Sequence, residues 1–539
     1  MKFKKWSFIF AMTLVAVVAL PIAIAAHAHP TQSRRAKHHH YQLVVVGTLG
    51  GPNSNFNHNG AIDINDVAVL NRSGSITGNA DTSTLDPFAG LYQWSWGYVA
   101  HTFQSQNGVM TDMGALPGGG SSSPTWESAN GLLAGVSENG QLDPLFSNLP
   151  EVHAVLWKNG SITDLGTLAG GGYQSEAEAV NSRGQVVGSA LNTIPDPNSM
   201  ASSNFWYWDV PYGYQQRAFL WDEKSGMQDL GTLGTGTDAR ATLINEKGQV
   251  VGWSYTNSAP GACGNGFALN TASFIWDKQN GMTDLGNLGG TCTLAFDLSN
   301  EGLVVGISYL AGDSYQHAFL WENGKLNDLG SALGGDNAGA NALNERGEAV
   351  GSASLIGNAI SHAALWKHAG EITDLGTLGK DACSFAAAIN NSTQIVGDST
   401  SAKDCGHFDH SHPFLWEKGS IVNLNALIPQ GVLHLVYAYA INDRGEIAAN
   451  GVDANGDQHA ALLIPCDEHH LGIEGCDYSL VDTTVGSQSP ALRSFSHALQ
   501  RPRQSGDQSV SHARPAVAEQ IVLRSSTRSL TQLISKETP

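Results

Sequence analysis

One stretch of the chain, His317 to Ser352, returns in altered form along most of the sequence and limits the folds that are available. It reads HAFLWENGKLNDLGSALGGDNAGANALNERGEAVGS. Its Asn323-Gly324 dipeptide is a strong two-residue turn signal, because both residues tolerate a positive φ. A second apolar run and turn follow, so each copy predicts two hairpins. Two hairpins make a four-stranded sheet of about 45 residues, the size of one propeller blade.

Eight copies of the repeat can be found by the apolar strand that begins the first hairpin. Six copies end in a tryptophan and two degenerate copies begin with histidine: Trp157, Trp221, Trp276, Trp321, Trp366, Trp416, His101 and His459. The strands are apolar on both faces, so each sheet needs a neighbour on either side. The sequence therefore predicts an all-β fold of eight four-stranded blades, or seven if a weak copy is absorbed.

The two ends of the repeat region complement one another. Tyr41–Leu49 matches the strand that follows a tryptophan strand, whereas His459–Ile464 matches a tryptophan strand that has no follower. Pairing them would complete one hairpin from both ends of the chain and remove the open sheet edges. We therefore expect a closed β-propeller over residues 41–465.

The linked pattern HAFLW…DLGTLGG…INxxGxVVG resembles that of the HAF-repeat family, the probable extracellular repeat proteins of bacteria. The resemblance covers roughly Tyr41 to Pro465. It implies a repeat fold and export from the cell. It supplies no catalytic residue that could be transferred to this chain.

The first 28 residues have the features of a secretory signal peptide. Basic residues precede an apolar run from Trp6 to Ala25, and Ala26-His27-Ala28 provides a cleavage site. The length of the apolar run leaves an uncleaved membrane anchor as the alternative. We expect a secreted, periplasmic or cell-surface protein without a membrane span in the mature chain, beginning with a flexible lead over residues 29–40.

The charge balance and the C-terminal composition limit the kinds of partner that we expect for this protein. With 28 basic and 48 acidic residues the net charge is −20, which argues against a nucleic-acid partner. Val485–Gln508 is rich in Ser, Gln, Arg and Pro, and basic residues are in excess from Pro490 onward. Residues 466–539 are therefore predicted to form a Cys-clasped, mostly disordered basic tail. We expect a monomer.

Six cysteines in an exported chain predict disulfides. Cys263 and Cys292 lie just outside the two ends of one hairpin, and Cys383 and Cys405 bracket another. The remaining two, Cys466 and Cys476, would close a small loop after the last strand. A metal site is the weaker alternative, because no C-x-x-C pair is present.

Two groups of polar residues are candidates for a functional site: the recurrent histidines and the segment Asp453–Asp457. A histidine recurs in most repeats and, as for His317 with Asp328, lies diagonal to an aspartate across the hairpin. A pairing that most blades share indicates a structural contact. Asp453, Asn455 and Asp457 resemble the start of a calcium loop, but the later glutamate is absent and the turn explanation is favoured. Calcium is thus the one cofactor that the sequence suggests.

Aromatic residues gather in two long loops on one predicted rim. They are Tyr92, Trp94, Trp96, Tyr98, Trp206, Tyr207, Trp208, Tyr212 and Tyr214. Such rings could hold a glycan or a protein, or could pack their own loops.

Two functions follow from these observations. The first is an exported non-enzymatic binding protein that uses the aromatic loops; the alternative is a propeller enzyme acting on extracellular polysaccharide. Catalytic groups near the axis would break the repeat in a single copy. The breaks that we recognise, Ala272, Gln104-Ser105 and Asn423, lose polar function or add only neutral groups. This favours binding, with no catalytic residue assigned.

Overall fold

The architecture is taken from a computed structural model that describes residues 37–56, 69–89, 97–145, 149–168, 172–198, 213–263, 269–331, 333–367, 371–401, 405 and 411–482. These residues form an all-β fold in which one short 3-10 helix, η2 (Leu424–Ala426), interrupts the strands. None of them belongs to a helix with the length and apolar character needed to cross a membrane. The predicted signal peptide and residues 483–539 lie outside the described residues.

Seven groups of four antiparallel strands follow one another along the chain, and we number them as sheets in that order. A single parallel pairing, Thr271 of β17 with Cys292 of β19, joins sheets 4 and 5 into one eight-stranded sheet. Sheet 1 contains β3 (Gly50–Asn55), β4 (Ile76–Leu85), β5 (Tyr98–Gln106) and β6 (Val109–Gly114). Sheet 2 contains β7 (Ser122–Glu127), β8 (Leu133–Leu142), β9 (Pro150–Lys158) and β10 (Ser161–Asp164). Sheet 3 contains β11 (Ser175–Val180), β12 (Val186–Pro195), β13 (Tyr214–Asp222) and β14 (Gly226–Asp229).

The next four sheets repeat this arrangement. Sheet 4 contains β15 (Ala239–Ile244), β16 (Val250–Pro260), β17 (Leu269–Asp277) and β18 (Gly281–Asp284). Sheet 5 contains β19 (Gly289–Leu298), β20 (Val304–Leu310), β21 (Gln316–Glu322) and β22 (Lys325–Gly330). Sheet 6 contains β23 (Gly334–Leu343), β24 (Ala349–Leu355), β25 (Ser361–Trp366) and β26 (Ile372–Gly376). Sheet 7 contains β27 (Cys383–Ile389), β28 (Ile395–Thr400), β29 (His412–Glu417) and β30 (Ser420–Asn423).

Sheet 8 combines the two ends of the repeat region. It contains β31 (His434–Ile441), β32 (Ile447–Val452), β33 (Gln458–Pro465) and the N-terminal β2 (Tyr41–Val45). The pairing runs from Tyr41 opposite Pro465 to Val45 opposite Ala461, as the complementary ends of the repeat predicted. The N-terminal strand thus supplies the hydrogen-bonding partner that β33 would otherwise lack.

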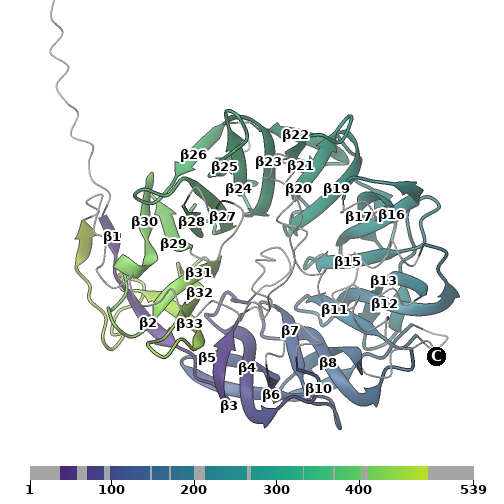
Figure 1. Ribbon diagram of the computed structural model, residues 1–539, viewed down its shortest axis with the longest axis horizontal. Helices are drawn as coiled ribbons and strands as arrows, with labels where there is room; N and C mark the ends of the chain where they lie inside the picture. Colours follow the sequence, from purple (N-terminus) through teal and green to yellow (C-terminus); the bar gives the residue numbers. More distant parts are fainter. Residues whose placement is uncertain are drawn as a thin grey trace, which may run out of the picture. The chain divides into compact units, whose positions relative to one another are not determined.

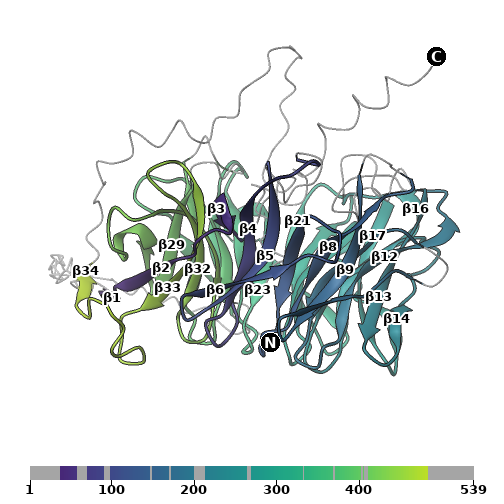
Figure 2. The same cartoon turned by 90° about the horizontal axis from the view of Figure 1, so that it is seen from below.

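Each sheet packs face to face on the next, which buries the apolar residues on both faces. Sheet 8 packs on both of its neighbours: Val396 of sheet 7 shares a core with Leu435, and Phe56 after β3 shares another with Ala460. Figure 1 shows the sheets around a common centre, with β7, β11, β15 and β31 nearer to it than β10, β26 and β30. From the side, the strands of the different sheets run between the same two rims (Figure 2). We call the first strand of each sheet its inner strand.

A series of asparagines links successive sheets at the turns before the V-V-G strands. The Asn181 Oδ1 accepts the backbone N–H groups of Arg183 and Gln185, and its Nδ2 donates to the Asn245 carbonyl at 3.2 Å. The same amide-to-carbonyl contact is made from Asn245, Asn344, Asn390 and Asn442. The last of them, at 3.0 Å, reaches Asn71 of sheet 1. The turn role expected for these residues is present, and the link between sheets is an additional finding.

A β-bulge recurs in the inner strands and explains the glycine of the V-V-G motif. In sheet 3 Ala177 pairs with Gly188 and Ala179 with Val187, so Glu178 is the bulged residue. A Cβ at Gly188 would lie 1.9 Å from the Glu176 carbonyl oxygen. Only glycine allows this close approach of the two backbones.

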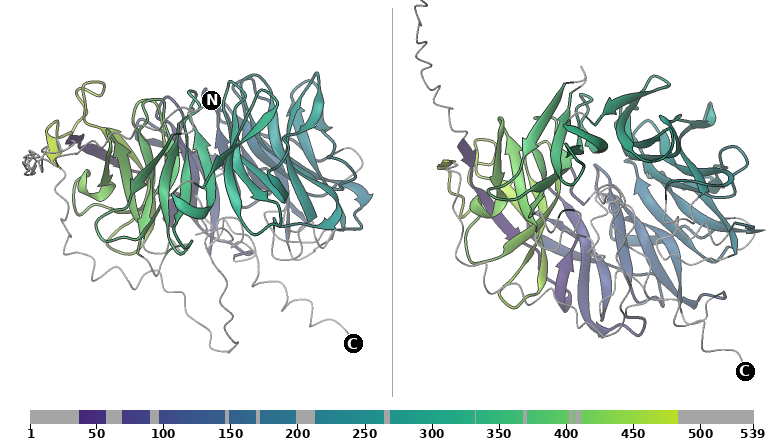
Figure 3. Two further views of the ribbon diagram at one scale, coloured as in Figure 1. Left: turned by 90° about the horizontal axis from the view of Figure 1, so that it is seen from above. Right: turned by 45° about the horizontal axis from the view of Figure 1, so that its top comes forward.

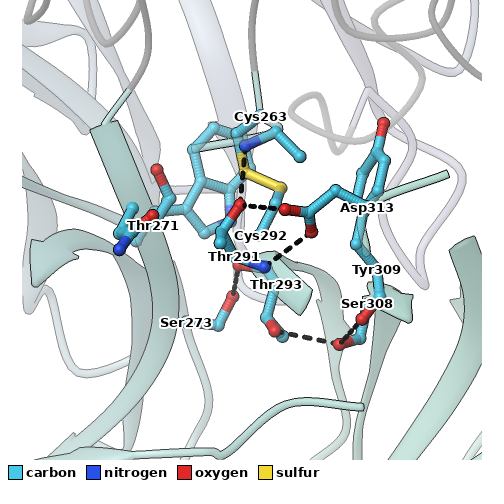
Figure 4. Close-up of a disulfide and its surroundings, with 12 residues drawn as sticks. Cys263, Thr271, Ser273, Thr291, Cys292, Thr293, Ser308, Tyr309 and Asp313 are labelled. Carbon is cyan, nitrogen blue, oxygen red and sulfur yellow. Dashed lines mark hydrogen bonds between the residues drawn. A yellow bond between two sulfur atoms is a disulfide. The ribbon is translucent and has the colours of Figure 1, made fainter. Parts of the chain in front are cut away.

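The three predicted disulfides are present: Cys263–Cys292, Cys383–Cys405 and Cys466–Cys476. Cys292 lies in the inner strand of sheet 5, so the first bridge ties the loop after β16 to the neighbouring sheet (Figure 4). Hydrogen bonds surround it: the Thr291 backbone N–H and hydroxyl donate to the Asp313 carboxylate at 2.8 and 2.9 Å. The bridge thus reinforces the junction of sheets 4 and 5.

The segments flanking the eight sheets pair with each other. β1 (Lys37–His39) and β34 (Leu480–Asp482) form a two-stranded sheet, and Figure 3 shows β34, in yellow, beside the purple β1 in both views. His38 is fully buried, and its Nδ1 lies 3.0 Å from the Glu417 Oε1. Residues 37–40, which the sequence assigns to a flexible lead, are therefore ordered here, because His38 is anchored on sheet 7.

Candidate active site

The aromatic residues predicted to bind a ligand are mostly not located by the structure. Tyr98 begins β5 opposite Leu85, and Tyr214 begins β13 opposite Pro195; both are half-buried. The other seven lie outside the described residues: Tyr92, Trp94, Trp96, Trp206, Tyr207, Trp208 and Tyr212. The two described rings, Tyr98 and Tyr214, lie in different sheets, and the predicted aromatic site stays a prediction.

The segment compared with a calcium loop forms a hydrogen-bonded turn. The Asp453 Oδ1 accepts the backbone N–H groups of Asn455 at 2.8 Å and Asp457 at 3.0 Å. These bonds, together with the nearby His459, hold the pKa of Asp453 below its usual range despite some desolvation. Among the described residues, no group of three His, Cys, Asp or Glu side chains is arranged to hold a metal ion.

The recurrent histidines are bonded to the aspartates across their hairpins. The His317 Nδ1 lies 2.9 Å from the Asp328 Oδ1, and Arg217 makes the corresponding contact with Asp229 at 3.1 Å. The same pair occurs in three other sheets: His101 with Asp112, His153 with Asp164, and His362 with Asp374. Because the contact is shared by sheets in different parts of the molecule, it is a structural contact.

A cluster of charged residues lies on the inner strands of sheets 3 and 4. The Arg240 Nη2 is 2.6 Å from the Glu178 Oε1 and 3.8 Å from the Glu176 Oε1. All three side chains are almost fully buried, with exposed fractions of 7%, 1% and 3% respectively. We call Glu176, Glu178 and Arg240 the central charge cluster. A guanidinium this close favours the ionised form of the carboxyl group that it contacts.

The central charge cluster occupies positions that are neutral in the other inner strands. Glu178 is a bulged residue, and six other inner strands have a bulge at the same place: Thr125, Thr242, Phe296, Asn341, Ala387 and Tyr439. Glu176 and Arg240 occupy the position two residues earlier, where the other inner strands carry Ser123, Leu294, Gly339, Phe385 and Tyr437. At these two positions of the inner strands that the structure describes, charged residues therefore occur only in the adjacent sheets 3 and 4.

Neutral groups at these positions are sufficient to join neighbouring sheets. The Thr125 hydroxyl donates to the Ala177 carbonyl at 2.9 Å, and the Asn341 Nδ2 donates to the Ala386 carbonyl at 3.1 Å. Buried charges add little to stability compared with such contacts, because desolvation offsets their attraction. Three buried charges at one junction are therefore not explained by the joining of the sheets alone, and they mark a candidate site.

This cluster corrects a premise of the sequence interpretation. The recognised breaks in the repeat added only neutral groups, but Glu176, Glu178 and Arg240 are charged breaks near the common centre. The signal was present in the segment SEAEAV, which aligns with ARATLI in the next copy. The tryptophan and V-V-G strands, which define the repeat, do not reveal this signal, because the charged residues lie in the more variable inner strand.

Comparisons with known proteins address the fold. No protein-family model matches the sequence, and no curated protein matches it. Among solved structures, an acylaminoacyl peptidase of Pyrococcus horikoshii is 12% identical with a TM-score of 0.35, over 61% of this chain and 49% of that one. The β-propeller domain of the trilobed protease from Pyrococcus furiosus is 10% identical with a TM-score of 0.33, over 66% and 96%. A dipeptidyl peptidase 4 of Porphyromonas gingivalis is 8% identical with a TM-score of 0.39, over 78% and 64%.

These proteins are peptidases, and this chain spans about half of the first and two thirds of the third. At such identities the likeness concerns the fold, and no peptidase residue is transferred. The prediction of a non-enzymatic binding protein is nevertheless wrong as the main interpretation, because it rested on breaks in the repeat that add only neutral groups, and Glu176, Glu178 and Arg240 are charged breaks. The enzymatic alternative is the one that we develop.

Proposed function

We propose that the protein is an exported β-propeller enzyme that acts on an extracellular polysaccharide, with Glu176 and Glu178 as its acid–base pair. The observation that carries the proposal is the replacement of neutral residues by two glutamates and an arginine on two adjacent inner strands. Two carboxyl groups in different surroundings can divide the roles of acid and base.

The division of roles follows from the distances to Arg240. Glu178 contacts the guanidinium and acts as the carboxylate, whereas Glu176 lies farther away and holds the proton. In glycosidic cleavage, Glu176 would donate this proton to the leaving oxygen. Glu178 would activate water or attack the sugar carbon, and water completes the hydrolysis. Arg240 is a positioning residue in this scheme.

Polysaccharide is the substrate class that suits this chemistry best. Hydrolysis between two carboxyl groups is the usual mechanism for glycosidic bonds. A peptidase of the serine type would need a nucleophile and its base, and the sequence has no G-x-S-x-G elbow.

The test is a polysaccharide panel treated with mature protein and assayed for new reducing ends. Glu176→Gln and Glu178→Gln should each lower kcat by about 10²–10⁴, the range for loss of an acid–base group. Glu176→Gln leaves the close Arg240–Glu178 pair intact, so its melting temperature should change little. Glu178→Gln breaks this buried pair and should lower the melting temperature, so its kcat is measured at a temperature at which the variant is folded. Asn341→Leu is the matched control at the equivalent bulge of sheet 6; it should lower stability and leave kcat unchanged.

Two outcomes would count against the proposal. The panel could yield no product with wild-type protein, or Glu176→Gln could lose stability and activity in parallel. The second outcome would assign the central charge cluster to the packing of sheets 3 and 4.

We also propose that the eight sheets close into one ring and that the chain is an exported member of the HAF-repeat family. Closure is supported by the β2–β33 pairing and by the Asn442 contact with Asn71. Export is supported by three disulfides and by the predicted signal peptide over residues 1–28. The family proposal rests on the repeat pattern. Secretion assays with and without residues 1–28 test the export.

A further inference from the structure

At two neighbouring contacts between successive sheets, which we call junctions, the loop after one sheet meets the start of the next inner strand through the same set of hydrogen bonds. The two junctions differ in one charged residue. At the first, between sheets 2 and 3, the Asp143 backbone N–H donates to the Leu149 carbonyl at 2.9 Å. The Asp143 Oδ2 accepts a hydrogen bond from the Gln174 Nε2 at 2.7 Å, and the Gln174 Oε1 accepts the Val152 N–H at 2.9 Å. At this junction an amide donates to an aspartate, so the hydrogen bond forms while the aspartate is ionised.

At the second junction, between sheets 3 and 4, an acid replaces the amide. The Asp196 N–H donates to the Gly213 carbonyl at 3.0 Å, as Asp143 does to Leu149 at the first junction. Asp238 occupies the place of Gln174: its Oδ1 accepts the Gln216 N–H at 2.7 Å, and its carbonyl accepts the Tyr255 N–H at 3.0 Å. The backbone hydrogen bonds of the two junctions are therefore equivalent. The difference is that the second junction has an acid, Asp238, where the first has the amide of Gln174.

The second junction is buried and short of hydrogen-bond donors. Asp238 is fully buried and Asp196 is 6% exposed. The Asp196 Oδ2 is buried and receives no hydrogen bond from the residues that the structure describes. The Asp238 Oδ2 accepts the Thr237 hydroxyl at 2.8 Å. A second buried carboxylate beside Asp196 is stable only if one of the two retains its proton.

The charged and titratable groups around the pair do not remove this requirement. Burial raises the pKa of Asp238 to about 7, and the charge of Asp196 adds to the effect. Arg217 acts in the opposite direction, but its guanidinium is engaged by Asp229 at 3.1 Å. On β16, burial together with Asp238 and Asp196 raises the pKa of Tyr255 well above its usual range, so the phenol stays neutral.

We propose that Asp196 and Asp238 form a pH-sensitive latch on the junction of sheets 3 and 4, closed while they share a proton and released when both are ionised. The latch does not depend on the proposed activity. Its consequence for the enzyme does rest on the proposed function: Asp238 lies two residues before Arg240, so release would loosen the strand that holds the central charge cluster.

The direction of the pH effect follows from linkage. A carboxyl group whose pKa is raised on folding stabilises the folded state at low pH. This contribution is lost as the pH rises through the pKa of the group in the folded protein. For Asp238, a shift from 3.8 to about 7 corresponds to on the order of thirtyfold in the closing equilibrium between pH 5.5 and 8.

The test is amide hydrogen exchange of the mature protein at pH 5.5 and 8, corrected for intrinsic exchange rates. Wild-type protein should lose protection in β15 by roughly tenfold or more at the higher pH. Asp238→Asn, which copies the amide of the first junction, should lose most of this dependence. Gln174→Glu should create a new pH-dependent loss of protection in β11, because it converts the first junction into an acid pair.

The latch is refuted if Asp238→Asn keeps the full wild-type dependence, or if Gln174→Glu adds none at β11. If Asp238→Asn fails to fold, Asp196→Asn removes the second charge of the pair and should weaken the dependence, whereas burial still acts on Asp238. An unchanged dependence in Asp196→Asn would refute the pairing of the two acids. Hydrogen exchange needs no substrate. Failure of the latch and failure of the polysaccharide activity are therefore seen in separate experiments.

Discussion

Arg240 is the residue through which the two glutamates of the central charge cluster are held in a buried site. Its Nη2 contacts the Glu178 Oε1 at 2.6 Å. Removing one partner of a buried ion pair leaves the other charge without compensation, which is more harmful than the pair is beneficial. The stability of this region should therefore be far more sensitive to Arg240 than to the threonine two residues later.

We expect Arg240→Met to destabilise the protein by about 3–5 kcal/mol, because two buried carboxyl groups lose their guanidinium. Thr242→Val, on the same strand, removes only a long hydroxyl contact with the Val251 carbonyl at 3.4 Å and should cost less than about 1 kcal/mol. Urea unfolding of both variants measures the difference. Equal midpoints would mean that Arg240 is not required to compensate the glutamates.

His153 is distinctive among the recurrent histidines because it has two carboxylate partners. Its Nδ1 is 2.9 Å from Asp164 and its Nε2 is 3.0 Å from Glu151. Burial acts to lower the pKa of His153, but the hydrogen bonds and charges of Asp164 and Glu151 outweigh it and raise the pKa. The imidazolium is therefore stabilised in the folded state.

A histidine whose pKa is raised on folding stabilises the fold at pH values below its pKa in the unfolded chain. This contribution is lost as the pH rises through its pKa in the folded protein. His153→Gln should therefore cost about 1–2 kcal/mol at pH 5.5 and clearly less at pH 8.5. Denaturant unfolding at the two pH values checks this, with His469→Gln as the control at an exposed histidine. A cost that is independent of pH would contradict the assignment.

The His–Asp contacts could be predicted from the sequence because both partners lie in one hairpin, where the turn fixes their spacing. His412 shows the limit of this reasoning. Its own hairpin carries Asn423 in place of the aspartate, and the His412 Nδ1 contacts Asp381 of the preceding loop at 2.9 Å. Arg240 and Glu178 belong to different repeats, so only the packing of two sheets brings them together.

At the level of the strand, the bulge decides which side chains reach the neighbouring sheet. The sequence predicted the V-V-G strands from their apolar character but not the bulge opposite the glycine. That feature depends on the approach of two backbones: a Cβ at Gly188 would lie 1.9 Å from the Glu176 carbonyl oxygen. The same contact fixes the backbone that carries Glu176 and Glu178.

Gly188→Ala should therefore destabilise the protein by about 1–3 kcal/mol, since the inner strand must shift to admit a methyl group. It should also lower any activity that depends on Glu176 and Glu178. Gly47→Ala is the matched control, because no atom lies within 4 Å of the position of its Cβ and its φ is unstrained. Thermal unfolding compares the two, and an equal effect would show that the close approach can relax.

At the scale of the whole molecule, the ends of the repeat region are joined by several kinds of contact. β2 pairs with β33, the Asn442 Nδ2 donates to the Asn71 carbonyl, and the Arg444 Nη1 donates to the Ser73 carbonyl at 3.1 Å. The strand pairing was predictable, because the two end segments are complementary halves of one repeat. The asparagine contacts were not, because each donor and its acceptor lie in different sheets.

The pairing of β2 with β33 makes the N-terminal strand important for the C-terminal sheet. Removing residues 29–45 would leave β33, a largely apolar strand, with an unpaired edge. Such an edge promotes association with other chains. We expect this deletion to lower the melting temperature and to cause aggregation visible by light scattering, whereas removing residues 29–36 leaves β1 and β2 intact and should change neither. A variant lacking residues 29–45 that melts and scatters like the full mature chain would show that the ends do not stabilise each other, and the sheets would then form an open array.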